Sequence, residues 1–111
     1  MKVFHVANAE RVEPPGHFGH LEVATITDLD EVAFRAQVSF CPPGGGGELH
    51  HHDDDDQLFV VVSGELTFRI GSGEEFTLGE HDAVLFKAGE AHYTENRSAD
   101  PSVSIVVTAR R

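Results

Sequence analysis

Several features that would mark a nucleic-acid-binding, secreted or membrane protein are scarce in this chain. Only 8 Lys and Arg side chains stand against 19 Asp and Glu, which gives a net charge of −11 at pH 7. Nucleic acid and anionic membranes both require a basic surface, so this composition disfavours either as a partner. The single cysteine, Cys41, excludes a disulfide within the 111 residues.

Long apolar runs are missing as well. The N-terminal residues, MKVFHVANAERVEPP, are too polar for a signal peptide. No apolar run approaches the roughly 20 residues that a membrane-spanning helix needs. These absences predict a cytoplasmic protein whose partner is a small molecule rather than a nucleic acid or a membrane.

Helical periodicity is also absent, while short apolar and alternating runs recur between Gly, Pro, Asp and Asn clusters. We expect strands at 20–27, 32–40, 57–62, 65–70, 75–78, 83–86, 91–95 and 103–108. Their number and spacing predict an all-β sandwich or jelly-roll barrel. The connections "SGE" (63–65) and "GSGEE" (71–75) predict tight hairpins, whereas "CPPGGGG" (41–47) predicts a break in the chain.

The chain has the length of one domain. Residues 1–19, which include "PPGHFGH", show no strand pattern and predict an irregular arm that covers a sheet edge or reaches a partner subunit. Residues 20–111 then form a single barrel domain.

The segment "GELHHHDDDDQLFVVVSGEL" (47–66) gathers three histidines and four aspartates before an apolar run. On a strand, His50 and His52 would point to the same face about 6.6 Å apart, close enough to converge on one ion. His51 would point away, and the aspartates would form a turn before a strand that begins at Gln57. A solvated polar loop has the same composition, so this segment alone leaves both interpretations open.

Together with a second histidine motif at 80–96, this segment resembles the cupin superfamily. The first cupin motif is a Gly, five residues, H-x-H, three or four residues, a Glu, six residues and a Gly. Here it is matched by Gly44, His50, His52, Gln57 and Gly64.

The second cupin motif is a Gly, five residues, P-x-G, two residues, a His, three residues and an Asn. It is matched by His81, Lys87, Gly89, His92 and Asn96, with every spacing kept. His81 replaces the Gly and Lys87 the Pro, and both positions shape the backbone, so the turn there could differ. The resemblance covers roughly residues 36 to 108.

The resemblance implies a cupin double-stranded β-helix, which is a jelly-roll barrel, around one divalent transition metal (Fe, Mn, Ni, Co or Zn). The implied metal ligands are His50, His52, Gln57 and His92. Because Gln57 replaces a glutamate, the ligand set is neutral, and the ion would be more Lewis-acidic but more weakly held. Asp56, one residue earlier, is the alternative fourth ligand.

Other residues carry weaker functional claims. For His17 and His20 we favour a solvent-facing arm over a second metal site. Cys41 precedes a Pro-Pro bend and is expected to be buried as a small apolar residue. Tyr93 adjoins His92 in the chain and should point to the opposite face, where it packs.

The segment 34–40 alternates two sets of side chains. Phe34, Ala36, Val38 and Phe40 form the apolar set, and Arg35, Gln37 and Ser39 form the polar one. The pattern favours the apolar set inside the barrel, although an inward Arg35 would suit a carboxylate or phosphate. Phe59, Phe68 and Phe86 are expected in the core or the pocket lining.

The resemblance implies two functional hypotheses. One is a metal-dependent enzyme, of the dioxygenase, isomerase or lyase type, that acts on a small oxygen-rich molecule such as a sugar or carboxylic acid. No general base is evident, with His81, Glu90, Tyr93 and Glu95 as candidates only. The alternative is a non-catalytic module that binds or senses a small molecule. The strand 57–62 is apolar on both faces and predicts a homodimer.

Overall fold

The computed structural model describes residues 1–111, and it contains ten β-strands and one short 3-10 turn. The elements are η1 (Val6–Asn8), β1 (His17–Phe18), β2 (Glu22–Thr27), β3 (Phe34–Cys41), β4 (Gly46–His50), β5 (Asp55–Ser63), β6 (Leu66–Ile70), β7 (Glu75–Leu78), β8 (Ala83–Phe86), β9 (His92–Glu95) and β10 (Ser102–Arg110). No helix is long and apolar enough to cross a bilayer.

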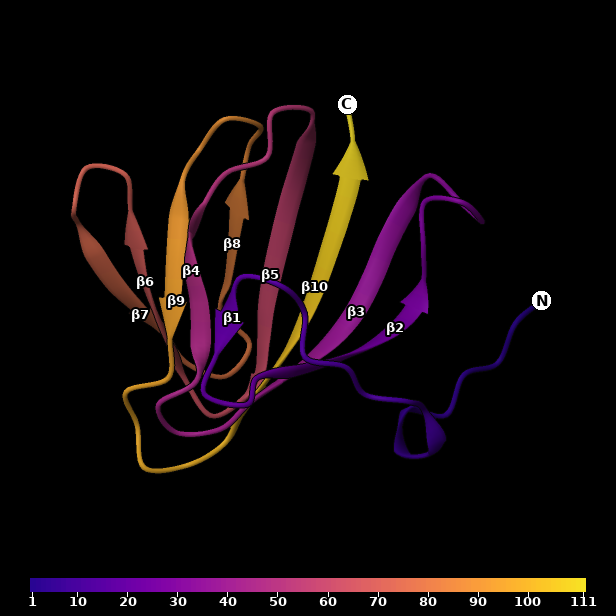
Figure 1. Ribbon diagram of the computed structural model, residues 1–111, viewed down its shortest axis with the longest axis horizontal. Helices are drawn as coiled ribbons and strands as arrows, with labels where there is room; N and C mark the ends of the chain where they lie inside the picture. Colours follow the sequence, from indigo (N-terminus) through magenta and orange to yellow (C-terminus); the bar gives the residue numbers. More distant parts are fainter.

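The strands form two antiparallel five-stranded sheets, in the orders β1-β4-β9-β6-β7 and β2-β3-β10-β5-β8. The sheets face each other as the walls of a barrel, with β6 and β7 at the left of Figure 1 and β3 and β2 at the right. From β3 to β10 the chain crosses repeatedly from one sheet to the other, which is the winding of a double-stranded β-helix. The all-β jelly-roll prediction is confirmed.

All eight predicted strands are present, but β1 and β4 were not expected. Strand β4 begins inside the glycine run. This run predicted a break because glycine has low strand propensity. A Cβ at Gly46 would collide with the carbonyl oxygen of Thr94 on β9 and lie 2.9 Å from the ring of Phe18 on β1. The glycines therefore allow β4 to fit between its two neighbours.

One of the two predicted hairpins is wrong. Ser63 ends β5 in one sheet and Leu66 begins β6 in the other, so "SGE" is a crossover between sheets. A Cβ at Gly64, whose φ is 75°, would lie 2.5 Å from the carbonyl oxygen of Pro101. The "GSGEE" hairpin is confirmed, because β6 and β7 pair directly.

The apolar core is built around a cluster of aromatic rings. It comprises Leu21, Val23, Cys41, Val61, Leu66, Phe68 and Phe86. Phe68 is fully buried, and its ring centroid lies 5.3 Å from that of Phe59, 5.5 Å from Phe76 and 5.8 Å from Phe86. Such aromatic pairs add about 0.5–1.5 kcal/mol each to the energy of area burial. The expected core role of Phe59, Phe68 and Phe86 is confirmed.

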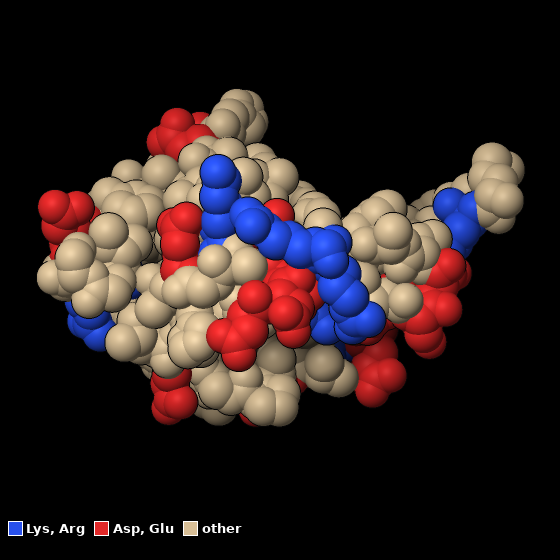
Figure 2. Space-filling view, turned by 90° about the horizontal axis from the view of Figure 1, so that it is seen from above, with Lys and Arg blue, Asp and Glu red and all other residues tan.

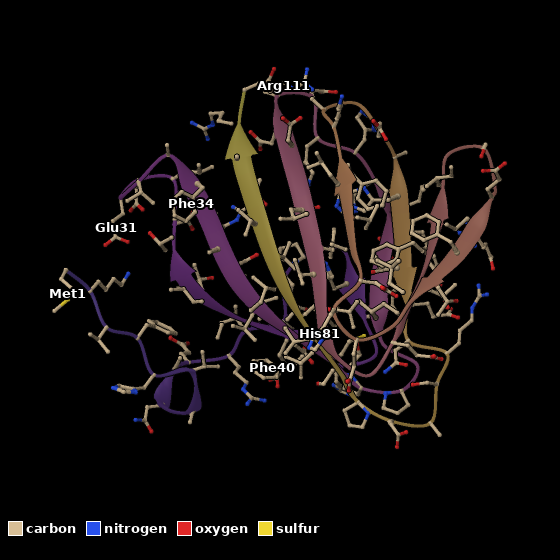
Figure 3. All side chains as sticks on the ribbon, turned by 180° about the vertical axis from the view of Figure 1, so that it is seen from behind. Met1, Glu31, Phe34, Phe40, His81 and Arg111 are labelled. Atoms are coloured by element: carbon tan, nitrogen blue, oxygen red, sulfur yellow. The ribbon has the colours of Figure 1, made fainter.

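The face of β3 that points into the barrel is the polar one, whereas the apolar one was predicted. Arg35, Gln37 and Ser39 line the barrel interior, whereas Phe34 is 43% exposed on the outside. Figure 3 labels Phe34 and Phe40 at the two ends of this strand. Alternation defines two faces but not which of them is inward. On the outer face, the guanidinium of Arg11 lies 3.6 Å from the ring centroid of Phe40, so the arm covers this ring with a cation–π contact.

The N-terminal arm runs away from the barrel at the right of Figure 1. Val12 forms a bridge with Val23 of β2, which is an edge strand, so the arm covers that sheet edge at this point. Lys2 Nζ donates a hydrogen bond to the carbonyl oxygen of Ile26, 2.6 Å away. The last part of the predicted arm, His17–Phe18, is strand β1.

Candidate metal centre

A cavity of about 620 Å³ opens between the two sheets. Its volume is that of a small-molecule site. The lining residues are Pro14, Pro15, Gly16, His17, Leu21, Val23, Arg35, Gln37, Ser39, Glu48, Leu49, His50, His52, Gln57, Phe59, Leu66, His92, Thr94 and Val106. All four residues of the implied ligand set are among them, and Asp56 is not.

Three imidazoles converge on this cavity from different elements. His50 ends β4 and is the register partner of His92 at the start of β9. Their ring centroids are 4.6 Å apart, and that of His52 lies 5.2 Å from His50 and 6.4 Å from His92. His52 lies two residues beyond the end of β4, in the irregular segment before β5, so His50 and His52 are not two residues of one strand as expected.

Backbone carbonyls set the tautomers of two of these rings. Nδ1–H of His50 donates to the carbonyl oxygen of Glu48 at 2.8 Å, and Nδ1–H of His92 donates to that of Glu90 at 3.3 Å. A carbonyl can only accept, so Nδ1 carries the proton in each neutral ring. The lone pair is then on Nε2, which is how metal-binding histidines are usually oriented.

Gln57 projects from β5 against His92. Its Oε1 lies 3.1 Å from Nε2 of His92, and its Nε2 donates to Oγ1 of Thr108 at 3.1 Å. The two facing atoms are both acceptors, so they need a cation between them or a reversed amide that donates to the imidazole. Adjacent ligands of one ion, each bound at about 2.1 Å, lie about 3 Å apart. The contact therefore fits a shared metal.

His52 contributes a further sign of a missing partner. Its Nε2 is buried and has no hydrogen-bond partner. Buried polar atoms are rarely left unpaired, because their desolvation is then uncompensated. Even so, no three His, Cys, Asp or Glu side chains are already gathered in metal-binding geometry. The donor set suits an imidazole–amide site for a divalent transition metal, with Gln57 supplying the oxygen.

Burial favours the neutral form of His92 and His52. Desolvation, assisted by the nearby His50, lowers the pKa of His92 to about 4, against the opposing hydrogen bond to Glu90. Burial, and after it the charge of His50, also lowers the pKa of His52. The His92 ring is stacked on Phe86 with centroids 4.1 Å apart, which holds its orientation. A neutral imidazole has its lone pair available for a metal at neutral pH.

The alternative ligand, Asp56, is engaged elsewhere. Its Oδ1 accepts from the peptide N–H of Ala88 at 2.9 Å and from Nε of Arg111 at 2.8 Å. Arg110 also lies near an aspartate, with Nε 3.9 Å from Oδ1 of Asp55. Seen from above, basic and acidic atoms lie side by side on this face (Figure 2). Part of the aspartate run thus ties the C-terminus to β5.

Asn96, the last residue of the second motif, has a structural role. It is fully buried, and its Nδ2 donates to the carbonyl oxygens of Cys41 at 3.0 Å and Asp100 at 2.8 Å. Its Oδ1 accepts from the peptide N–H of Ser98 at 3.0 Å. The side chain therefore joins the end of β3 to the segment before β10.

His81 keeps the backbone of the glycine that it replaces. Its φ is 68°, and its peptide N–H donates to the carbonyl oxygen of Val61 at 2.7 Å. This left-handed conformation costs a non-glycine residue about 1–2 kcal/mol. The turn thus has a backbone conformation that favours glycine, and it lies toward the opposite end of β5 from Gln57 (Figure 3).

The remaining predictions for single residues are mostly confirmed. His51 is exposed beside Asp53, and Tyr93 packs outside the cavity between Phe18 and Arg69. Cys41 is buried, and burial raises the pKa of its thiol to about 11. None of the four suggested general bases lines the cavity.

Two cavity residues were not recognised from the sequence. His17, expected to face solvent, lines the cavity mouth, and its ring centroid is 6.4 Å from that of His50. Its partner in that prediction, His20, is exposed and pairs with Glu13. Arg35 lies inside because the polar face of β3, and not the apolar face as predicted, is turned toward the cavity. Nδ1–H of His17 donates to the carbonyl oxygen of Pro15 at 2.9 Å, and no sequence signal pointed to its place in the cavity.

The fold and the cavity define a small β-helical barrel with an internal cluster of imidazoles. The sequence profile of the cupin domain matches residues 38–108, and the chain belongs to this family. Comparison with curated protein sequences finds no match.

Solved structures share the fold over the whole chain. A Thermotoga maritima protein described as a predicted oxalate decarboxylase has a TM-score of 0.89 at 22% identity, covering 99% of this chain and 100% of its own. The TT1209 protein of Thermus thermophilus has a TM-score of 0.79 at 25% identity, covering 100% and 99%. A cupin-superfamily sugar phosphate isomerase from Silicibacter pomeroyi has a TM-score of 0.79 at 22% identity, covering 99% and 76%.

Proposed function

We propose that this cupin binds a divalent transition metal through His50, His52, Gln57 and His92 and acts on a small oxygen-rich molecule in the cavity. The observation that carries the proposal is the convergence of these side chains, with His92 Nε2 and Gln57 Oε1 facing each other at 3.1 Å. A bound metal would polarise substrate oxygens as a Lewis acid. The reaction would be of the dioxygenase, isomerase or lyase type, and two similar structures are described as a predicted decarboxylase and an isomerase.

The chain's own residues prepare the site. The carbonyls of Glu48 and Glu90 hold two imidazoles with their lone pairs free, and Thr108 orients the Gln57 amide. Phe59 and Leu66 provide an apolar wall that limits water near the ligands. Substrate would enter past His17 at the mouth.

The second candidate is a non-catalytic module that binds or senses a small molecule. It is favoured by the shortage of acid–base groups, because Glu48 is the only carboxylate in the cavity lining and it is exposed. Proton transfer in an enzyme would then depend on His17, on Glu48 or on the substrate itself.

Metal analysis of protein purified without a nickel column tests the metal site. We expect about one ion per chain in the wild type, removable by a chelator. His52→Ala should lose most of the metal, whereas His51→Ala, one residue away and exposed, should retain it. Gln57→Glu should hold the metal more tightly, because a carboxylate offsets part of its charge.

Equal metal contents in the His51 and His52 variants would contradict the ligand assignment. A folded wild type that stays free of metal after incubation with Fe, Mn, Co, Ni and Zn salts would favour the binding module. Turnover that disappears with the chelator and returns with metal would favour the enzyme.

A further inference from the structure

We propose that the cavity is built for a small oxyanion, a carboxylate or phosphate group, and that Arg35 anchors it opposite the imidazoles. The proposal rests on the proposed function for the metal end of the ligand, but the part played by Arg35 can be measured separately. It concerns the wall of the cavity formed by β3 and β10.

The position of Arg35 follows from the register of three strands. Thr108 on β10 is paired with Arg35 on β3 and with Gln57 on β5. The three side chains therefore form one row across the inner face of the sheet. Adjacent strands are about 4.8 Å apart, so the Cα atoms of Arg35 and Gln57 are roughly 10 Å apart. A short ligand can reach both the guanidinium and the proposed metal position.

The guanidinium of Arg35 lacks a close partner. Its Nε is buried and forms no hydrogen bond. The carboxylate beside it belongs to Asp28, whose Oδ1 is 3.8 Å from Nη1 and whose side chain is 47% exposed. This contact is too long for a strong hydrogen bond. A carboxylate or phosphate that binds the guanidinium side-on would satisfy Nε together with a terminal nitrogen.

Two further polar side chains continue the same wall. Gln37 and Ser39 follow Arg35 at alternate positions of β3 and line the cavity. The Nε2 of Gln37 donates to Oγ1 of Thr25 at 3.1 Å, which leaves its Oε1 as an acceptor. An amide oxygen and a hydroxyl suit the hydroxyl groups of an oxygen-rich ligand.

The charges inside the cavity favour an anion, although the whole chain carries −11. Gln57 is neutral, and Glu48, the single carboxylate of the lining, is exposed at the mouth. If the ligand were neutral, the charge of Arg35 would be offset only by the partly exposed carboxylate of Asp28, 3.8 Å away. A partly buried cation with so weak a partner is costly, so an anionic ligand is selected over an isosteric neutral one.

Calorimetric titration with malonate, glycerol 3-phosphate and neutral glycerol tests the inference. The protein is metal-loaded, and its metal content is measured in every variant. Wild type should bind at least one of the two anions, and the stronger of them identifies a carboxylate or a phosphate site. Arg35→Gln should weaken that binding ten- to a hundredfold, and Arg35→Lys should weaken it less. The control Arg11→Gln, which removes an outer charge, should leave it unchanged.

Three results would overturn the inference. Glycerol could bind as tightly as the anions, none of the three probes could bind, or Arg35→Gln could leave anion binding unchanged. In these cases an intact metal content leaves the proposed metal site standing. If the folded wild type holds no metal, the proposed function fails, and the same titrations on metal-free protein decide the role of Arg35. Circular dichroism of the two Arg35 variants separates loss of binding from loss of fold.

Discussion

Two regions of the barrel interior differ in what they contain. Around β6 and β8 the interior is aromatic, with Phe68 and Phe86 buried and in contact. Along β3 and β10 it is polar: Arg35, Gln37 and Ser39 face inward on one strand, and Ser104 and Thr108 are buried on the other. The part of the sheet formed by β3 and β10 thus has a mostly polar inner side and, on its outer side, half-buried apolar residues such as Ile105.

The difference indicates that one region stabilises the fold and the other binds the ligand. The aromatic region gains stability from burial and close packing, which dominate folding energetics. The polar region contributes little, since Ser102 Oγ, Ser104 Oγ and Arg35 Nε are buried without partners. Such unpaired groups are typical of functional sites, where a ligand supplies the missing bonds.

The largest expected effect is in the aromatic region. Phe68→Ala removes a side chain with no exposed surface and should lower the free energy of unfolding by about 3–5 kcal/mol. Chemical denaturation of metal-free protein measures it. A loss below about 1 kcal/mol would mean that this cluster is not the main source of stability.

A smaller effect is expected at His92, where the two regions meet. Its folded-state pKa of about 4 lies below its ordinary value of 6.5, so between these values the unfolded chain takes up a proton that the folded chain does not. Stability of the metal-free protein is therefore full above pH 6.5 and falls by roughly 3 kcal/mol as the pH drops to 4. His92→Phe, which can keep the stack on Phe86, should remove this part of the pH dependence. An unchanged slope would contradict it.

The homodimer stays a prediction, and a substitution on the outer face of the polar region tests it. Ile105 lies on the central strand β10 between Val38 and Val60, all apolar and on the outer side. If two copies pair through this face, Ile105→Asp should weaken the dimer at least tenfold in sedimentation equilibrium. Val3→Asp, at a 69% exposed site in the arm, is the control. A monomeric wild type at micromolar concentration would rule out this pairing.

The smallest effect is expected at Ser104. Its Oγ is buried without a partner, so Ser104→Ala removes an unsatisfied group and little volume. We expect a change within about 1 kcal/mol, neutral or stabilising. Thermal melts of the metal-free variant measure it, and a loss above about 2 kcal/mol would reveal a hydrogen bond that the polar region depends on.

Much of the fold could be predicted from local patterns. The positions of eight strands followed from alternation and turn residues, and the jelly-roll class from their number. Strand β4 was missed because its two glycines have low strand propensity, and its formation depends on close contact with Thr94 and Phe18. The crossover at Gly64 was taken for a hairpin because a short turn sequence does not reveal which sheet the next strand joins.

The candidate site was predicted in part. The spacings of the two motifs identified the four residues that line the cavity together. Such spacings can be read from the sequence without knowledge of the fold. They did not reveal His17, which reaches the cavity through β1, or the inward direction of Arg35. Both depend on which face of a strand points into the barrel. Alternation in the sequence separates the two faces but does not show which of them is inward.

By itself, the sequence determined that this protein is an acidic, all-β chain with the histidine and glutamine spacings of a cupin, because composition and periodicity are local properties. Only the tertiary structure decided that β3 turns its polar side inward and that Arg35 faces the imidazoles. The physical reason is that strand register and sheet covering arise from contacts between segments far apart in the chain. Such contacts leave no signature within either segment.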